Sequence, residues 1–170
     1  MSSPWSPVIA STCDRGASTC SRVGYTSEVS PDPDSAILLF AHGARDPAWA
    51  DPFRRIAARV REARPGLRVE LAFLELMKPA LSEAVAGLAA SGARRITLVP
   101  LFLAQGGHLR EDLPRLLEGV RQRHPDLRID VTSAIGDSSV LTDAIAGWAL
   151  SQHLGLPEAS QDTASSPESR

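Results

Sequence analysis

The sequence predicts an α/β protein built on a small open sheet of about four parallel strands flanked by helices. Apolar runs alternate with stretches in which apolar residues recur at helical spacing, four times between residues 35 and 154. A continuous apolar run such as Ala36–Ala41 is typical of a strand buried on both faces. Strands separated by helices of about a dozen residues pair in parallel through right-handed crossovers. These features together indicate a flavodoxin-like architecture.

The strands are expected where apolar and β-branched residues are concentrated. The third run contains Pro100, which has no N–H to donate, so the ladder should be interrupted or bent there. The four expected strands are Ala36–Ala41, Arg68–Glu75, Arg95–Leu103 and Arg128–Ala134.

Each expected strand is followed by a segment with helical periodicity. The first, residues 49–64, ends at Pro65-Gly66, and the others lie between Pro79 and Gly92, from His108 to about His124, and after Gly136-Asp137. Residues expected to face the core are Phe53, Ile56, Ala57 and Val60 in the first helix and Val140, Leu141, Ala144, Ile145 and Trp148 in the last.

Length and composition indicate one globular domain. The chain has 170 residues, of which 43% are hydrophobic and 22% charged. A net charge of −2 without a basic run argues against nucleic acid as a partner. No apolar run approaches the roughly 20 residues of a membrane span, so we expect no membrane partner.

The two ends of the chain differ in composition from its centre. Residues 1–34 are rich in Ser, Thr and Pro and are expected to form a disordered leader, and residues 155–170 a flexible tail. Residues 35–154 then form the domain. The cysteines, Cys13 and Cys20, both lie in the leader, and a domain without thiols fits a cytoplasmic location.

Three chemically active side chains follow three of the expected strands. His42 follows the first strand, Glu75 closes the second and His108 follows the third. Since the carboxyl ends of parallel strands meet at one edge of a sheet, these side chains should converge there. Two imidazoles and a carboxylate form a common ligand set for a divalent metal ion.

Each of these residues also has a simpler interpretation. A histidine in a loop is more often a satisfied hydrogen-bonding group than a ligand, and Glu75 could pair with an arginine. Glu111 and Asp112 suit the positive start of a helix, although Asp112 lies one turn from His108 and could orient it. Arg45 and Arg110 are either solvated charges or cations beside the mouth of the site.

Four segments resemble a known family. They are AHGARDPAW, FLELMKP, PLFLAQGGHLREDLP and AIGDSSVLTDAI, and they follow one another in this order between residues 36 and 150. Together they resemble the short CbiX-type sirohydrochlorin chelatases of the class II chelatase group.

The resemblance implies a lyase reaction in which a divalent metal enters sirohydrochlorin, a tetrapyrrole, and two protons are released. The metal is a substrate, with cobalt favoured over iron or nickel, in cobalamin or sirohaem biosynthesis, and no organic cofactor is expected. His42 and His108 match the family's metal-binding and catalytic histidines. Glu75 matches an acidic position of the family only by its place at the end of the second expected strand. Arg45 and Arg110 could steer the carboxylates of the macrocycle, and a short chain of this kind is expected to form a homodimer.

Other classes of function are less well supported by the sequence. A non-enzymatic carrier of divalent metal ions could use the same histidine pair, and it would bind cobalt without accelerating its insertion. A histidine phosphatase has arginine directly before its histidine, whereas Ala41 precedes His42 here. A nucleotide-binding function is disfavoured because the sequence has neither G-x-G-x-x-G nor a Walker pattern.

Overall fold

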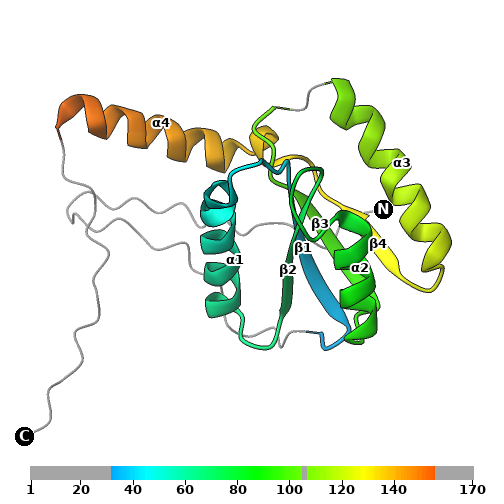
Figure 1. Ribbon diagram of the computed structural model, residues 1–170. Coiled ribbons are helices and arrows are strands. Elements are labelled where there is room, and N and C mark those ends of the chain that lie inside the picture. Colours follow the sequence, from blue (N-terminus) through cyan, green and yellow to red (C-terminus); the bar gives the residue numbers. More distant parts are fainter. Residues whose placement is uncertain (1–31, 105–106, 156–170) are drawn as a thin grey trace, which may run out of the picture. The chain divides into compact units, whose positions relative to one another are not determined.

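A computed structural model describes residues 32–104 and 107–155, with the backbone alone for residues 107–111 (Figure 1). Four strands form one parallel sheet in the order β2-β1-β3-β4. The strands are β1 (Ser35–Ala41), β2 (Arg68–Phe73), β3 (Arg95–Pro100) and β4 (Arg128–Val131). The predicted sheet class is confirmed; the predicted leader and tail lie almost wholly outside the described residues.

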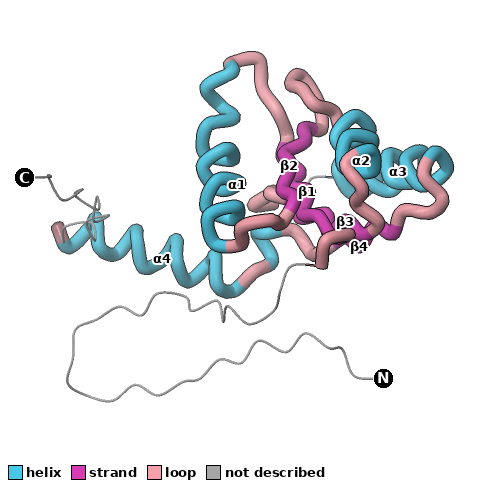
Figure 2. Tube along the Cα trace, turned by 90° about the horizontal axis from the view of Figure 1, so that it is seen from below, coloured by secondary structure: helices cyan, strands magenta, loops and turns pink. Residues whose placement is uncertain are grey.

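Helices cover both faces of this sheet (Figure 2). The helical elements are η1 (Pro47–Ala50), α1 (Asp51–Ala63), α2 (Leu81–Ala90), α3 (Gly107–Arg123), η2 (Ile135–Asp137) and α4 (Ser139–Leu154). α1 covers one face, where Ala57 packs with Leu39 and Val69. α2 and α3 cover the other, where Val85 and Leu117 belong to one cluster with Phe40.

Strand β1 lies at the centre of the fold, and its side chains pack against the helices on both faces of the sheet. Leu38 and Phe40 are fully buried toward α2 and α3, and Leu39 is buried toward α1. A strand buried on both faces needs the uninterrupted apolar run that the sequence shows. The side chains of this strand therefore anchor both helical layers at once.

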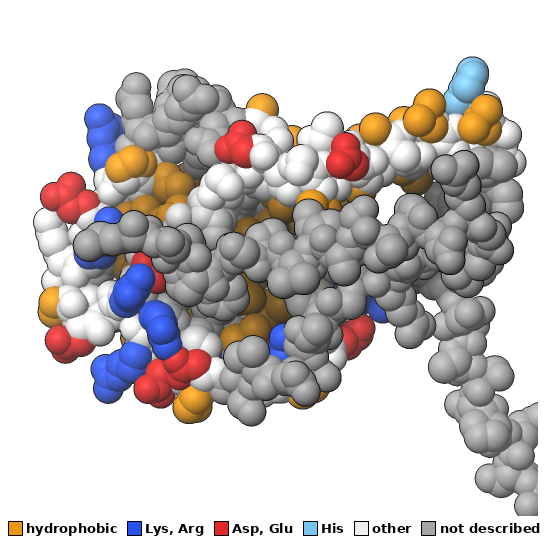
Figure 3. All heavy atoms as spheres, turned by 180° about the vertical axis from the view of Figure 1, so that it is seen from behind, with side chains coloured by type: hydrophobic (Ala, Val, Ile, Leu, Met, Phe, Trp, Pro, Cys, Tyr) orange, Lys and Arg blue, Asp and Glu red, His pale blue; other side chains and the backbone are white. Residues whose placement is uncertain are grey.

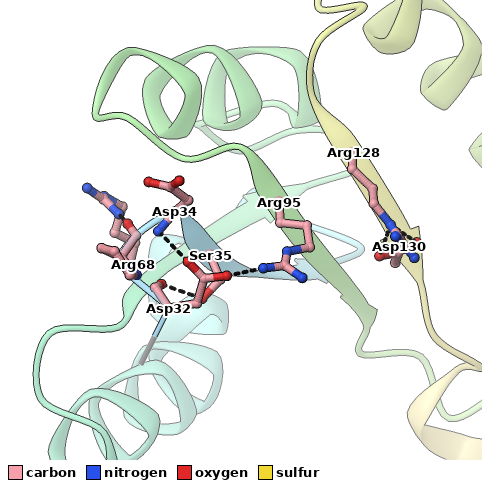
Figure 4. Close-up of polar contacts among 8 residues, drawn as sticks. Asp32, Asp34, Ser35, Arg68, Arg95, Arg128 and Asp130 are labelled. Atoms are coloured by element: carbon pink, nitrogen blue, oxygen red, sulfur yellow. Dashed lines mark hydrogen bonds and ion pairs between the residues drawn. The ribbon is translucent and has the colours of Figure 1, made fainter. Parts of the chain in front are cut away.

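The amino edge of the sheet is held by polar contacts (Figure 4). Asp32 forms an ion pair with Arg95, and its carboxylate accepts a hydrogen bond from the Asp34 N–H at 3.0 Å. Arg68 donates to the Pro33 carbonyl, and Arg128 pairs with Asp130 at 2.8 Å. These contacts tie the start of β1 to both of its neighbours and leave the opposite edge for the candidate site.

Helix α2 begins at a charged clasp. The Glu83 carboxylate accepts hydrogen bonds from Lys78 Nζ at 2.6 Å and from the Ala80 N–H at 2.8 Å. The hydrogen bond from Lys78, followed by that from Ala80, lowers the pKa of Glu83 below its ordinary value. An anion held at the first turn also suits the helix dipole, so the clasp fixes where the β2–α2 loop ends.

Three strands end earlier than the sequence predicted. β2 ends at Phe73, β3 at Pro100 and β4 at Val131. Pro100 is the last residue of its strand, so its missing N–H lies at the end of the ladder and does not interrupt it. Beyond Phe73 the chain turns at Leu76, whose φ is +61°.

The predicted inward face of the last helix is wrong. No residue of α4 is buried: Val140 is 70% and Ile145 45% exposed, and only Leu141 and Ser151 are even half-buried. Ile56 of α1, also expected inside, is 42% exposed. The sequence shows that α4 is apolar, but not which surface covers it. None of the helices that the structure describes could span a lipid bilayer.

Candidate active site

The candidate site lies at the carboxyl edge of the three adjacent strands β2, β1 and β3. The registers pair Ala41 with Phe73 and Phe40 with Pro100, so the three strands end at nearly the same level. His42 follows β1 directly, and Glu75 lies two residues beyond β2. The expected placement of these two side chains at one edge is therefore what the backbone register produces.

Backbone hydrogen bonds continue the β1–β2 pairing past the strands. The Leu74 N–H donates to the Ala41 carbonyl at 2.9 Å, and the Glu75 N–H donates to the His42 carbonyl at 3.0 Å. These bonds fix the two loops relative to each other. They bring the His42 and Glu75 side chains to the same place at the edge of the sheet.

His42 and Glu75 form an exposed pair. His42 Nε2 lies 3.1 Å from Glu75 Oε1, and the two side chains are 55% and 54% exposed. Two donor atoms that each lie about 2.1 Å from one ion, at right angles, are about 3.0 Å apart. The pair can thus hold a divalent ion at two adjacent coordination positions. The carboxylate also lies close enough to the imidazole to influence its orientation.

The imidazole also lies against a pair of aromatic rings. The ring of Phe102 meets that of His42 edge to face, with centroids 6.4 Å apart, and the ring of Phe40 lies 5.7 Å from that of Phe102. Phe40 and Phe102 are buried. The inner side of the His42 ring therefore faces buried aromatic residues, while the His42 side chain itself is exposed at the edge of the sheet.

Gly43 permits the close approach of the two loops. Its φ is +99°, and a Cβ on it would lie 1.9 Å from the Glu75 carbonyl oxygen. Any other residue would face both backbone strain and a clash with backbone atoms. The glycine beside His42 thus has a structural reason: it lets the His42 loop pack directly on the loop that carries Glu75.

A second glycine supports the loop after β3. The Gly136 N–H donates to the Phe102 carbonyl at 3.0 Å, and a Cβ on Gly136 would lie 1.9 Å from the Leu103 carbonyl oxygen. The Leu101 N–H in turn donates to the Phe40 carbonyl at 2.7 Å. These contacts hold the chain after β3 as far as Leu103.

The remaining predicted residues are only partly described. His108 is the second residue of α3, which starts on the side of the sheet where the strands end (Figure 1). The side chains of His108 and Arg110 lie outside the described part of the structure, so their convergence on His42 stays a prediction. Arg45 is exposed in the loop after His42, and Asp112 is half-buried in α3.

The described residues alone do not complete a metal site. They contain no group of three His, Cys, Asp or Glu side chains that could hold an ion together. A cavity of about 570 Å³ lies between α2 and the outer edge of β2 and contains none of the candidate residues. A third ligand would have to come from elsewhere, and the sequence predicts His108 for that role.

Comparison with known proteins defines the family. The family model described as CbiX matches residues 36–148, which is most of the chain. The chain belongs to the CbiX family. The matched range begins in β1 and includes His42, Glu75 and His108.

Curated relatives and solved structures agree with this assignment. The sirohydrochlorin cobaltochelatase of Saccharolobus solfataricus is 37% identical over 106 residues, which are 59% of this chain and 81% of the relative. That of Saccharolobus islandicus is 44% identical over 81 residues, and there the match spans only 62% of the relative's length and 48% of this chain.

Two solved structures share the fold. A CbiX protein from Marinobacter aquaeolei, described as a putative cobalamin biosynthesis protein, has a TM-score of 0.63 at 32% identity, covering 71% of this chain and 98% of its own. SirB from Bacillus subtilis with Fe³⁺ has a TM-score of 0.62 at 26% identity, covering 73% of this chain but 48% of SirB. One SirB chain is therefore about twice as long as the part that matches this CbiX chain.

Sequence reasoning misses the parts of the site that only packing reveals. The sequence pattern places Phe102 in a strand and gives no sign of its contact with His42. The close approaches of Gly43 and Gly136 are missed as well, although each glycine stands in a segment that resembles the family. The signal that the sequence offers for such a close approach is the position of Gly43 directly after the candidate ligand His42.

We predict that Gly43→Ala separates the two loops. The substitution should destabilise the fold by about 1–3 kcal/mol, because it combines a positive φ with a backbone clash. It should also weaken Co²⁺ binding, measured by calorimetric titration, because His42 and Glu75 no longer meet. Gly87→Ala is the matched control: Gly87 lies in α2 with open space around it, and alanine there should stabilise the helix. Equal effects of both substitutions would contradict this role for Gly43.

Proposed function

We propose that this chain is a metal chelatase that inserts Co²⁺ into sirohydrochlorin. The observation that carries the proposal is the exposed His42–Glu75 pair, whose 3.1 Å separation suits two adjacent positions around one ion. The names of the curated relatives and membership of the CbiX family support the substrate and the metal. Fe²⁺ and Ni²⁺ accept the same donor atoms, so cobalt rests on the relatives' names.

In the proposed reaction the metal and the macrocycle meet over His42. Two pyrrole N–H bonds break, the ring nitrogens bind the ion, and two protons leave. His42 and His108 hold the incoming ion as it loses water, and an imidazole can accept a pyrrole proton near neutral pH. Glu75 shares the positive charge of the ion and passes a proton to solvent, with which it is in contact.

Two exposed leucines directly follow residues of the site in the sequence, and we propose that they contact the flat macrocycle. Leu76 follows Glu75 and is 62% exposed, and Leu103 follows Phe102 and is 69% exposed. Each is held by its backbone: Leu76 by the turn that closes with a 2.7 Å bond from the Met77 N–H to the Glu75 carbonyl, and Leu103 by its contact with Gly136. Exposed leucines on fixed loops suit an apolar ring face.

Charge and assembly complete the proposal. The carboxylates of sirohydrochlorin would be drawn by Arg45 and Arg110 and by the free N–H groups at the start of α3. The working unit would be a pair of chains, since this chain matches about half of SirB. The domain without cysteine suits the cytoplasm, where we place the reaction.

We predict that His42→Ala and His108→Ala each lower the rate of Co²⁺ insertion at least about a hundredfold, because each removes a ligand or a proton acceptor. The rate is measured by the absorbance change of sirohydrochlorin. His124→Ala, at the far end of α3, is the control and should keep the rate. Retention of most activity by either site variant would contradict the assigned roles. A wild-type protein that binds Co²⁺ but gives only the spontaneous rate would be a carrier and not an enzyme.

We predict that Leu76→Asn and Leu103→Ser each raise the KM for sirohydrochlorin roughly five- to tenfold. This corresponds to the loss of about half of the free energy gained by burying a leucine side chain. Their affinity for Co²⁺ alone should stay unchanged, because neither side chain offers a ligand. Leu116→Ser, an exposed leucine of α3, serves as the control. An unchanged KM in both loop variants would mean that the ring does not lie between these leucines.

A further inference from the structure

The loop that carries Glu75 has a strained turn next to this residue. Leu76 has a φ of +61°, and among the residues that the structure describes no other residue except glycine has a positive φ. Leucine is disfavoured in this left-handed region because its Cβ crowds the following carbonyl oxygen. Such a conformation persists only when the surrounding contacts impose it. The contacts that hold Leu76 therefore also hold its neighbour Glu75.

The first half of this loop is held by the strand ends beneath it. The Glu75 N–H donates to the His42 carbonyl at 3.0 Å, and the Met77 N–H closes the turn on the Glu75 carbonyl at 2.7 Å. The Met77 side chain packs against a buried cluster that includes Phe73. The side chains of His42 and Glu75 are both more than half exposed, so their closeness depends on the backbone that carries them.

The second half of the loop returns to the same strand and is closed by Glu83. The Phe73 N–H donates to the Pro79 carbonyl at 3.0 Å, and Phe73 forms an isolated parallel bridge with Ala80. In the clasp, the Glu83 carboxylate lies 2.6 Å from Lys78 Nζ and 2.8 Å from the Ala80 nitrogen. The loop thus starts and ends at Phe73, and the clasp holds the residues on both sides of Pro79.

An exposed ion pair is by itself no sign of function. Acidic and basic side chains lie next to each other elsewhere on the molecule, as Figure 3 shows for one face. Lys78 and Glu83 are 76% and 49% exposed, and pairs of this kind contribute little to stability. The Glu83 carboxylate, however, also accepts the N–H of Ala80, the residue at which the loop meets α2. A carboxylate that binds the backbone in this way fixes how the chain enters a helix.

We propose that Glu83 is a positioning residue that holds Glu75 beside His42. The clasp keeps the loop closed on Phe73, and the closed loop imposes the turn at Leu76 that presents Glu75 at the edge of the sheet. Glu83 acts through this loop and not as a ligand. The inference rests on the proposed function for the role of Glu75 in holding the metal ion.

Glu83→Ala tests the clasp in the full-length chain. It should raise the hydrogen-exchange rate of the Glu75 N–H, followed by NMR, roughly three- to tenfold, which is the effect of losing one helix cap. Co²⁺ binding, measured by calorimetric titration, should weaken by a similar factor. Glu83→Gln keeps an acceptor for the Ala80 N–H and should restore most of the affinity. An unchanged exchange rate of the Glu75 N–H in Glu83→Ala would overturn the proposal.

Asp51→Ala is the matched control. Asp51 is also an acidic residue in the first turn of a helix, and it pairs with Arg54 at 2.7 Å with a similar exposure of 52%. Its loss should change neither the exchange rate of the Glu75 N–H nor the affinity for Co²⁺. Equal effects of Asp51→Ala and Glu83→Ala would mean that the site responds to any helix start, and would overturn the role of Glu83. Circular dichroism checks that each variant keeps its helices.

A double-mutant cycle with Glu75→Gln separates positioning from a general loss of stability. If Glu83 acts through Glu75, Glu83→Ala should weaken Co²⁺ binding less than about twofold in the Glu75→Gln background. The full three- to tenfold loss in that background would overturn the proposal. If Glu75→Gln alone binds Co²⁺ as tightly as the wild type, Glu75 is not a ligand. That result would count against the proposed function alone, since hydrogen exchange reports separately whether the clasp holds the loop.

Discussion

The pairing of β1 with a strand on each side determines where the candidate site lies. Its register aligns the carboxyl ends of β2, β1 and β3, and two further backbone hydrogen bonds extend the β1–β2 pairing to His42 and Glu75. Gly43 then lets the two loops pack at backbone distance. A polar pair can be held open to solvent in this way because the strands beneath it are buried and rigid.

The sequence predicted the sheet well because burial on both faces leaves a strong pattern. The run in β1 is apolar throughout, and the helix periods of α1 to α3 match the faces that Ala57, Val85 and Leu117 bury. It failed where packing partners decide the outcome. The apolar stripe of α4 predicted burial, but the strands that it would cover present Thr97 and the Arg128–Asp130 pair on that side. Periodicity shows that a helix needs a cover without showing where the cover is.

The candidate site was predictable to the level of topology. His42 and Glu75 could be placed together because a parallel sheet brings strand ends to one edge, and their separation confirms that step. Their support could not be predicted. The contact of Phe102 with His42 and the closeness of Gly136 to Leu103 depend on how loops distant in sequence pack. Family membership covers residues 36–148 and so includes all of these positions, but it assigns no contact among them.

We propose that His42 and His108, from different strand ends, hold one metal ion together with Glu75. Cobalt K-edge X-ray absorption of the protein loaded with one Co²⁺ per chain tests it most directly, because imidazole rings give a characteristic outer-shell scattering. We expect two imidazole ligands in the wild type and one in either histidine variant. A single imidazole in the wild type, or two that persist in His42→Ala, would contradict it.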